Sequence, residues 1–130
     1  MKIIDGTNAI LGRLASFAAK EIIKGENIVI INCEEIKISG NRLKIKEKIK
    51  EKRSKIGSGQ KGPKYSRINH NIVKRAIRGM LPSHRTSRGQ TLLKNIKCFS
   101  GTPNEFHDKE TIKLPRKISN KFIKIKELKK

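Results

Sequence analysis

Residues 2–31 have the sequence KIIDGTNAILGRLASFAAKEIIKGENIVII, in which the spacing of apolar residues changes twice. Lys2–Asp5 is a short run of strand-forming residues. A helical spacing of three and four residues follows, carried by Leu11, Leu14, Ala15, Ala18, Ala19, Ile22 and Ile23. Gly25 would end this helix, and Ile28–Ile31 is an unbroken apolar run, as in a strand buried on both faces of a parallel sheet. Strand, helix and strand in this order predict a βαβ unit with a right-handed crossover.

A short strand and a lysine-rich helix are expected next. Ile36–Ile38 is the expected third strand. From Arg42 to Lys55 a thin apolar stripe predicts a helix that covers one edge of the core, with its cations in solvent or on RNA. That stripe consists of Leu43, Ile45, Ile49 and Ile56. Residues 57–62, GSGQKG, are expected to form a loop.

Residues 67–79 form the most informative predicted helix. At 100° per residue, one broad apolar face consists of Ile68, Ile72, Val73, Ala76 and Ile77. The opposite face carries Arg67, Asn71, Lys74 and Arg78, with Arg75 at the margin. Gly79 and Pro82 would end the helix. We therefore expect a core stripe backed by a cationic ridge.

Two further features concern the ends of elements. Thr7 or Asn8 is available as the N-cap of the first helix, and Thr86 or Ser87 as the N-cap of a short late helix. Ile96–Phe99 is the expected last strand. Beyond this strand the chain is basic and punctuated by proline. We expect a single domain over residues 1–130, with a globular core over about 1–112 and a basic C-terminal arm over 113–130.

Charge is the main indication of function. Lys and Arg number 32 and Asp and Glu number 11, which gives a formal net charge of +21. Between Glu51 and Glu105 there is no acidic residue, whereas Lys and Arg recur throughout the interval. A solvated face normally mixes both signs, so a polyanion is expected to supply the missing negative charge. Nucleic acid is the leading partner, and an anionic membrane surface or a merely basic surface are the alternatives. No segment is long and apolar enough for a membrane span, and Asp5 interrupts any signal peptide.

The residue types favour a folded RNA over a single strand. Proteins that bind single strands usually stack bases on aromatic rings, yet this chain has four Phe, one Tyr and no Trp. Contacts to phosphate and sugar are therefore expected, with backbone N–H donors near Thr86 as an addition. The candidate RNA-binding residues are Lys61, Lys64, Arg67, Lys74, Arg75, Arg78, Gly79, His84, Arg85 and Arg88. In this set Gly79 would allow a close approach of the backbone.

Catalysis, metals and cofactors have little support. Residues 57–62 match G-x-G-x-x-G, but the motif runs into Pro63 and does not connect a strand to a helix. The carboxylates lie mostly in the first 51 residues and the tail, and no spacing indicates a catalytic triad. Cys33 and Cys98 are expected as two buried thiols in a reducing cytoplasm, since no zinc-ligand spacing is present. We expect no enzyme activity, no metal, no cofactor and no small-molecule substrate.

Four motifs resemble a known family, the large-subunit ribosomal protein family L-thirteen in its archaeal and eukaryotic branch. They are residues 10–16 (ILGRLAS), residues 31–41 (INCEEIKISGN), residues 62–90 with RGMLP and HRTSRGQ, and residues 97–103 (KCFSGTP). The resemblance implies a three-layer α/β/α fold around a mostly parallel four-stranded sheet. It also implies a structural constituent of the large ribosomal subunit, in the cytoplasm, that binds large-subunit rRNA, contacts neighbouring ribosomal proteins and supports subunit assembly.

The chain departs from the family at several positions. Ile68 and Asn69 stand where the family usually has Ala-Pro, Ser83 is one residue more than usual, and Arg85 replaces a usual Lys. The long C-terminal extension of eukaryotic members is missing, which favours an archaeal or reduced protein. Two other functions stay open at this point. A freestanding RNA-binding regulator would be found mostly outside ribosomes, and an RNA-modifying enzyme would need a cofactor pocket.

Overall fold

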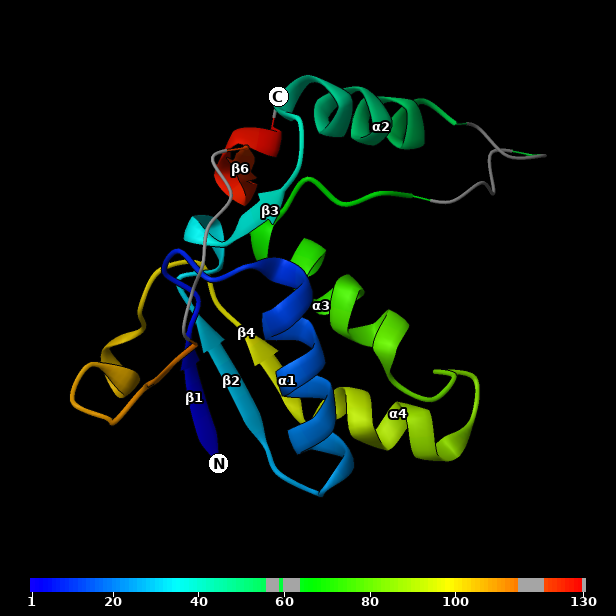
Figure 1. Ribbon diagram of the computed structural model, residues 1–130. Helices are drawn as coiled ribbons and strands as arrows, with labels where there is room; N and C mark the ends of the chain where they lie inside the picture. Colours follow the sequence, from blue (N-terminus) through cyan, green and yellow to red (C-terminus); the bar gives the residue numbers. More distant parts are fainter. Residues whose placement is uncertain (56–58, 60–63, 115–120, 130) are drawn as a thin grey trace.

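The computed structural model describes residues 1–55, 59, 64–114 and 121–129, and its centre is a four-stranded sheet (Figure 1). The strands follow the order β4-β2-β1-β5, and all neighbours pair in parallel. Their bounds are β1 Lys2–Asp5, β2 Ile28–Ile31, β4 Ile96–Cys98 and β5 Ile112–Lys113. The expected α/β class and mostly parallel sheet are therefore confirmed. The fourth strand is β5, which the sequence pattern did not indicate.

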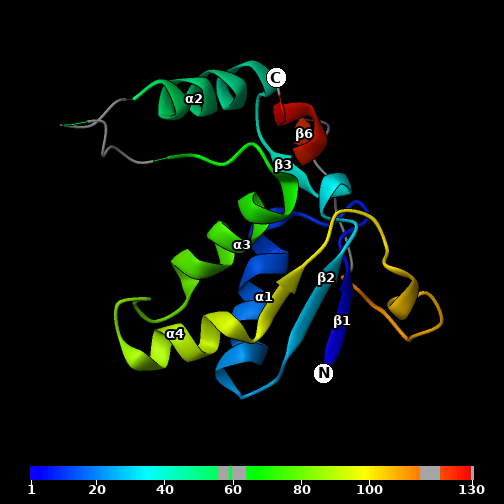
Figure 2. The ribbon, with the colours of Figure 1, turned by 180° about the vertical axis from the view of Figure 1, so that it is seen from behind.

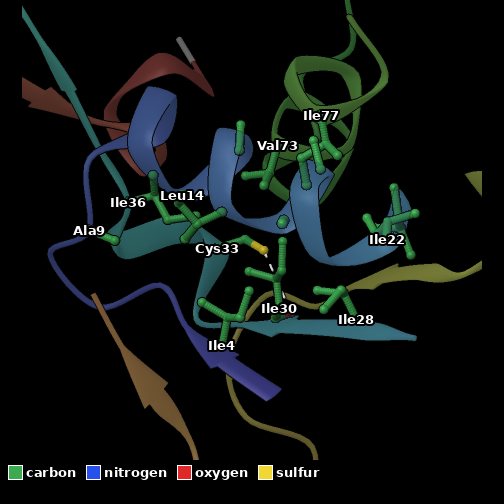
Figure 3. Close-up of a cluster of buried hydrophobic side chains, with 14 of the residues drawn as sticks. Ile4, Ala9, Leu14, Ile22, Ile28, Ile30, Cys33, Ile36, Val73 and Ile77 are labelled. Atoms are coloured by element: carbon green, nitrogen blue, oxygen red, sulfur yellow. Dashed lines mark hydrogen bonds between the residues drawn. The ribbon is translucent and has the colours of Figure 1, made fainter. Parts of the chain in front are cut away.

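Two helices cover one face of this sheet. They are α1, Leu11–Ile23, and α3, Asn69–Met80. Ile4, Ile28 and Ile30 point from the sheet towards these helices, where Leu14 and Val73 meet them in one buried cluster (Figure 3). The βαβ unit and the two amphipathic helices thus form, because each helix buries its apolar stripe against the strands. Helix α3 begins two residues later than expected, so Arg67 and Ile68 precede it, and Ile68 is exposed rather than part of the core face.

The opposite face of the sheet is covered by an irregular segment. Ile3, Val29 and Ile31 are buried there beneath Phe106 and Phe99, whose ring centroids lie 5.9 Å apart. Phe106 belongs to the 3-10 turn η3, Asn104–Phe106. The segment that carries these rings lies on the side of the sheet away from α1 and α3 (Figure 2). Layers therefore lie on both faces of the sheet, and the second layer is thin.

The start of α1 corrects one expectation. Neither Thr7 nor Asn8 caps the helix, which begins after Ile10 without a side-chain cap. Thr7 instead donates from its backbone N and its Oγ1 to Asp5 Oδ1, at 2.9 and 2.7 Å. Asn8 adopts a left-handed conformation with φ of 56°. The carboxylate at the end of β1 therefore binds Thr7, one of the two residues that were expected to cap the helix.

A buried carboxylate ties α1 to the first strand. Glu21 is only 6% exposed. It accepts hydrogen bonds from the ammonium groups of Lys2 on β1 and of Lys24, the latter at 2.7 Å. These two cations lower the pKa of Glu21 to about 2, so that it stays ionised despite its burial.

The C-terminal segment corrects a second expectation, that of a basic arm over residues 113–130. Strand β6, Phe122–Lys124, pairs antiparallel with β3, Lys37–Ser39, and the 3-10 turn η4, Ile125–Lys129, follows. Ile123 and Ile125 are fully buried. Glu35, in the turn η1 (Cys33–Glu35), pairs with Lys124 at 2.5 Å and with Lys126 at 2.7 Å. The lysine-rich composition concealed an alternation in which every second residue turns inward.

Two further helices complete the described structure. The lysine-rich helix α2, Arg42–Ser54, is capped by Asn41, whose side chain accepts a hydrogen bond from Leu43 N at 3.0 Å. Ile49 packs inward against the C-terminal segment, as expected for a helix that covers an edge, but Leu43 of the expected stripe is exposed. The short helix α4, Ser87–Lys94, is capped by Thr86 as predicted. None of the helices in the described ranges is long and apolar enough to cross a membrane.

The two cysteines, far apart in sequence, lie side by side. Cys33 is buried as expected, whereas Cys98 is only half-buried, and both are free thiols. A hydrogen bond between the thiols, together with burial, raises the pKa of Cys33. The same hydrogen bond and the charge of Lys74 lower the pKa of Cys98. Pairing of β2 with β4 brings the two residues together.

Candidate nucleic-acid interface

Helix α3 joins the hydrophobic core to a basic surface. Its inner side is buried at Ile72, Val73 and Ile77. Its outer side carries Asn71, Lys74, Arg75 and Arg78. Because the inner side is fixed in the core, the cations project from a helix whose backbone is held in place.

A hollow of about 500 Å³ lies along this outer side, and no acidic residue is among the described residues that line it. The lining residues are Lys64, Ser66, Asn71, Lys74, Arg75, Arg78 and Leu93. Leu93 comes from α4, and Lys64 and Ser66 come from the extended segment before α3. Four cations with neutral hydrogen-bonding groups between them suit an anionic backbone, because phosphate oxygens accept from both kinds of donor.

Two arginines, Arg53 of α2 and Arg75 of α3, hold the segment before α3 through its carbonyl oxygens. Arg75 Nη1 donates to the carbonyl oxygen of Lys64 at 3.2 Å, and Arg53 Nη2 donates to that of Ser66 at 3.4 Å. The ring of Tyr65 lies between them, with its centroid 5.0 Å from the Arg75 guanidinium and 5.7 Å from that of Arg53. Arg75 is thus partly engaged within the protein and also fixes one wall of the hollow.

The loop between α3 and α4 is folded tightly onto the start of α4. Thr86 Oγ1 accepts from Gly89 N at 3.1 Å and donates to the carbonyl oxygen of Ser83 at 2.7 Å. Gly89 lies so close to this turn that a Cβ there would be 2.0 Å from the same Ser83 oxygen. Because glycine has no side chain, the loop can pack directly against the N-terminus of α4. The exposed His84 and Arg85 of the loop therefore lie beside the start of this helix.

We predict that Gly89→Ala destabilises the free protein by about 1–3 kcal/mol, because the added methyl group overlaps backbone atoms that cannot move aside cheaply. Urea unfolding followed by circular dichroism measures the change. Gly79→Ala is the matched control, since a Cβ there meets nothing within 4 Å among the described residues beyond its own turn of helix. The control should leave stability unchanged or raise it by up to about 1 kcal/mol through helix propensity. Equal stability of the two variants would contradict the tight packing of the loop.

The structure places nine of the ten candidate residues, and Lys61 lies outside the described residues. Lys64, Lys74, Arg75 and Arg78 line one hollow. Arg67 lines a different one. His84, Arg85 and Arg88 are exposed on the loop and on the first turn of α4, and Gly79 is exposed at the end of α3. Their contact with RNA stays a prediction.

Sequence reasoning missed several residues that shape this surface. Ser66 and Leu93 line the hollow, Tyr65 spaces the two arginines, and Gly89 holds the loop. No periodic pattern could have indicated Ser66 or Tyr65, because the segment is extended and its neighbours come from α2 and α3. Gly89 falls within the first turn of a helix, where glycine is usually a weak choice. That position was a signal for close packing that could have been used.

Comparisons with known proteins agree on one family. The family model described as Ribosomal protein L13 matches residues 1–105. Three archaeal relatives carry the name Large ribosomal subunit protein uL13. The relative from Archaeoglobus fulgidus is 38% identical over 122 residues, which are 94% of this chain and 77% of the relative. That from Methanosphaera stadtmanae is 40% identical over 129 residues, 97% and 90% of the two chains. That from Methanosarcina barkeri is 38% identical over 134 residues, 98% and 94% of the two chains.

Proposed function

The chain belongs to the ribosomal protein L13 family, and from that premise we propose that it binds folded large-subunit rRNA and supports assembly of the large subunit. It is a structural component of the ribosome, and so of the cytoplasm, rather than an enzyme. The proposed interface consists of α3, the loop that follows it, the start of α4 and the extended segment before α3. Neighbouring ribosomal proteins are the other proposed partners.

The observation that supports this proposal is that the two sides of α3 have different surroundings. One side of the helix is buried in the core at Ile72, Val73 and Ile77, and the other side lines a hollow with Lys74 and Arg78. A charge of +21 on a chain of 130 residues opposes compaction unless a polyanion neutralises it. A fixed row of cations along a hollow suits a backbone with regularly spaced phosphates.

Sucrose-gradient sedimentation of a tagged copy from cell lysate, at low and at high salt, tests the proposal. We expect the protein to stay with the large subunit through a high-salt wash, because a buried component is held by more than surface charge. Contacts to 6–10 phosphates alone would weaken by about 10³–10⁵ between 50 and 200 mM salt, by the rule for duplex DNA. Loss of the protein to the top of the gradient would overturn the proposal and favour a freestanding RNA-binding regulator.

A further inference from the structure

Helix α2 is a second concentration of positive charge, separate from the interface proposed above. Its exposed cations include Lys44, Lys46, Lys48 and Lys50. Among the described residues these four lysines form no ion pair, whereas Arg42 pairs with Glu127 and Lys55 with Glu51. Helix α2 lies at the opposite end of the molecule from α4, with α3 between them, in both views of the ribbon (Figures 1 and 2).

A groove of about 560 Å³ runs along one side of α2. Its lining residues are Leu43, Lys46, Glu47, Lys50, Arg53, Ser54 and Arg67. Lys46, Lys50 and Ser54 follow one another at intervals of four residues, so they form a single row on the helix. Arg67 faces this row from the extended segment before α3 and is exposed. The groove thus presents the cations of Lys46, Lys50 and Arg67. Arg53 also lines it but donates to carbonyl oxygens of the protein, and the Ser54 hydroxyl donates to the carbonyl oxygen of Glu51 at 2.8 Å.

The extended segment separates this groove from the hollow on α3. Lys64 and Ser66 line the hollow, whereas Arg67 lines the groove. Ser66 and Arg67 are consecutive residues, yet their side chains line different hollows. Arg53 and Arg75 hold the same segment in place through the carbonyl oxygens of Ser66 and Lys64. The two basic surfaces therefore share no lining residue, and residues 64–67 lie between them. A single RNA strand cannot lie in both without crossing this segment.

Helix α2 is also held firmly enough to present a fixed surface. Ile49 is buried against Ile123 and Leu128 of the C-terminal segment. Arg53 Nη1 donates to the carbonyl oxygen of Leu128 at 2.6 Å. The helix that carries the row of lysines therefore has a fixed position relative to α3. A ligand with regularly spaced phosphates binds best to cations that project from such a fixed element.

We propose that the groove beside α2 binds the sugar-phosphate backbone of a second RNA segment, so that one chain holds two RNA segments together. This inference rests on the RNA-binding function proposed above. Lys46, Lys50 and Arg67 pair with phosphates. Glu47, the only carboxylate among the described lining residues, accepts a hydrogen bond from a ribose 2′-hydroxyl, a group that RNA has and DNA lacks. The exposed Leu43 lies against sugar.

Two double variants with the same change in charge test this inference. Lys46→Glu with Lys50→Glu removes cations from the groove. Lys44→Glu with Lys48→Glu changes the same helix by the same charge, on the side away from the groove. Each full-length variant is bound to full-length large-subunit rRNA made by transcription. Hydroxyl-radical footprinting locates the protected nucleotides, and the salt dependence of binding counts phosphate contacts.

The groove variant should lose protection of one RNA segment and keep the segment that depends on Arg78. The slope of log affinity against log salt should fall in magnitude by about 2, since each phosphate contact contributes about 0.9. The control variant should keep both segments and a nearly unchanged slope. Identical footprints for the two double variants, or joint loss of both segments, would overturn the inference. The single variant Arg78→Glu is footprinted alongside them. If its footprint were also unchanged, the proposed function itself would be overturned.

Discussion

Arg78→Glu is expected to lower the affinity of the protein for large-subunit rRNA by roughly tenfold to a hundredfold and to block its incorporation into the subunit. Arg78 is exposed on the outer side of α3 and lines the basic hollow. A hydrogen bond to a charged group contributes about 1.5–3 kcal/mol, and about 1.4 kcal/mol corresponds to a tenfold change in affinity. Replacement by glutamate removes such a contact and adds repulsion from the phosphates.

The measurement has two parts. Filter binding at fixed salt gives the affinity for the rRNA, and sedimentation of a tagged copy gives the incorporated fraction. Circular dichroism should be unchanged, because Arg78 makes no side-chain hydrogen bond or ion pair within the described residues. Lys20→Glu is the matched control, since Lys20 is exposed on α1 and lies outside both basic hollows. A normally folded Arg78→Glu variant that still enters the subunit would remove α3 from the interface.

Ile125→Ala should destabilise the protein by about 2–5 kcal/mol, which is a large part of the stability of a domain of this size. Ile125 is fully buried and belongs to the same cluster as Leu14 and Val73 in the main core. Its backbone N also donates to the carbonyl oxygen of Ile36 at 3.0 Å. A cavity at this position would therefore open where the C-terminal segment meets the rest of the fold.

Chemical denaturation of the free protein measures this effect. Ile23→Ala is the matched control, because it removes the same atoms from an isoleucine that is 47% exposed. Removal of residues 121–130 should be more severe still, since it also takes away Ile123 and Leu128. If Ile125→Ala and Ile23→Ala proved equally mild, the C-terminal segment would behave as the loose basic arm that its composition indicated.

The helices were predictable because the pattern that forms them is local. In α1 and α3 the apolar residues recur every three or four positions, so burial of one stripe follows from the sequence alone. Thr86 was likewise recognisable as a cap, since its partner Gly89 lies only three residues away. The long interval without acidic residues indicated a polyanion partner, because charge can be counted along the chain without reference to the fold.

The short strands were not predictable, because their partners are distant in sequence. Strand β5 has two residues and is defined only by its pairing with β1. Strand β6 pairs with β3, about 85 residues earlier, and its lysines suggested solvent rather than a sheet. The error over the C-terminal arm arose there, since alternation over a few residues is too short a signal to outweigh composition.

The sequence by itself determined the βαβ core, the amphipathic helices and the basic character of the surface, because periodicity and charge are properties of neighbouring residues. Only the tertiary structure decided which cations act together. Lys64 and Arg67 are three residues apart, yet they line different hollows because Arg53 and Arg75 hold the chain between α2 and α3. That arrangement depends on contacts among three separate elements, and no local pattern records them.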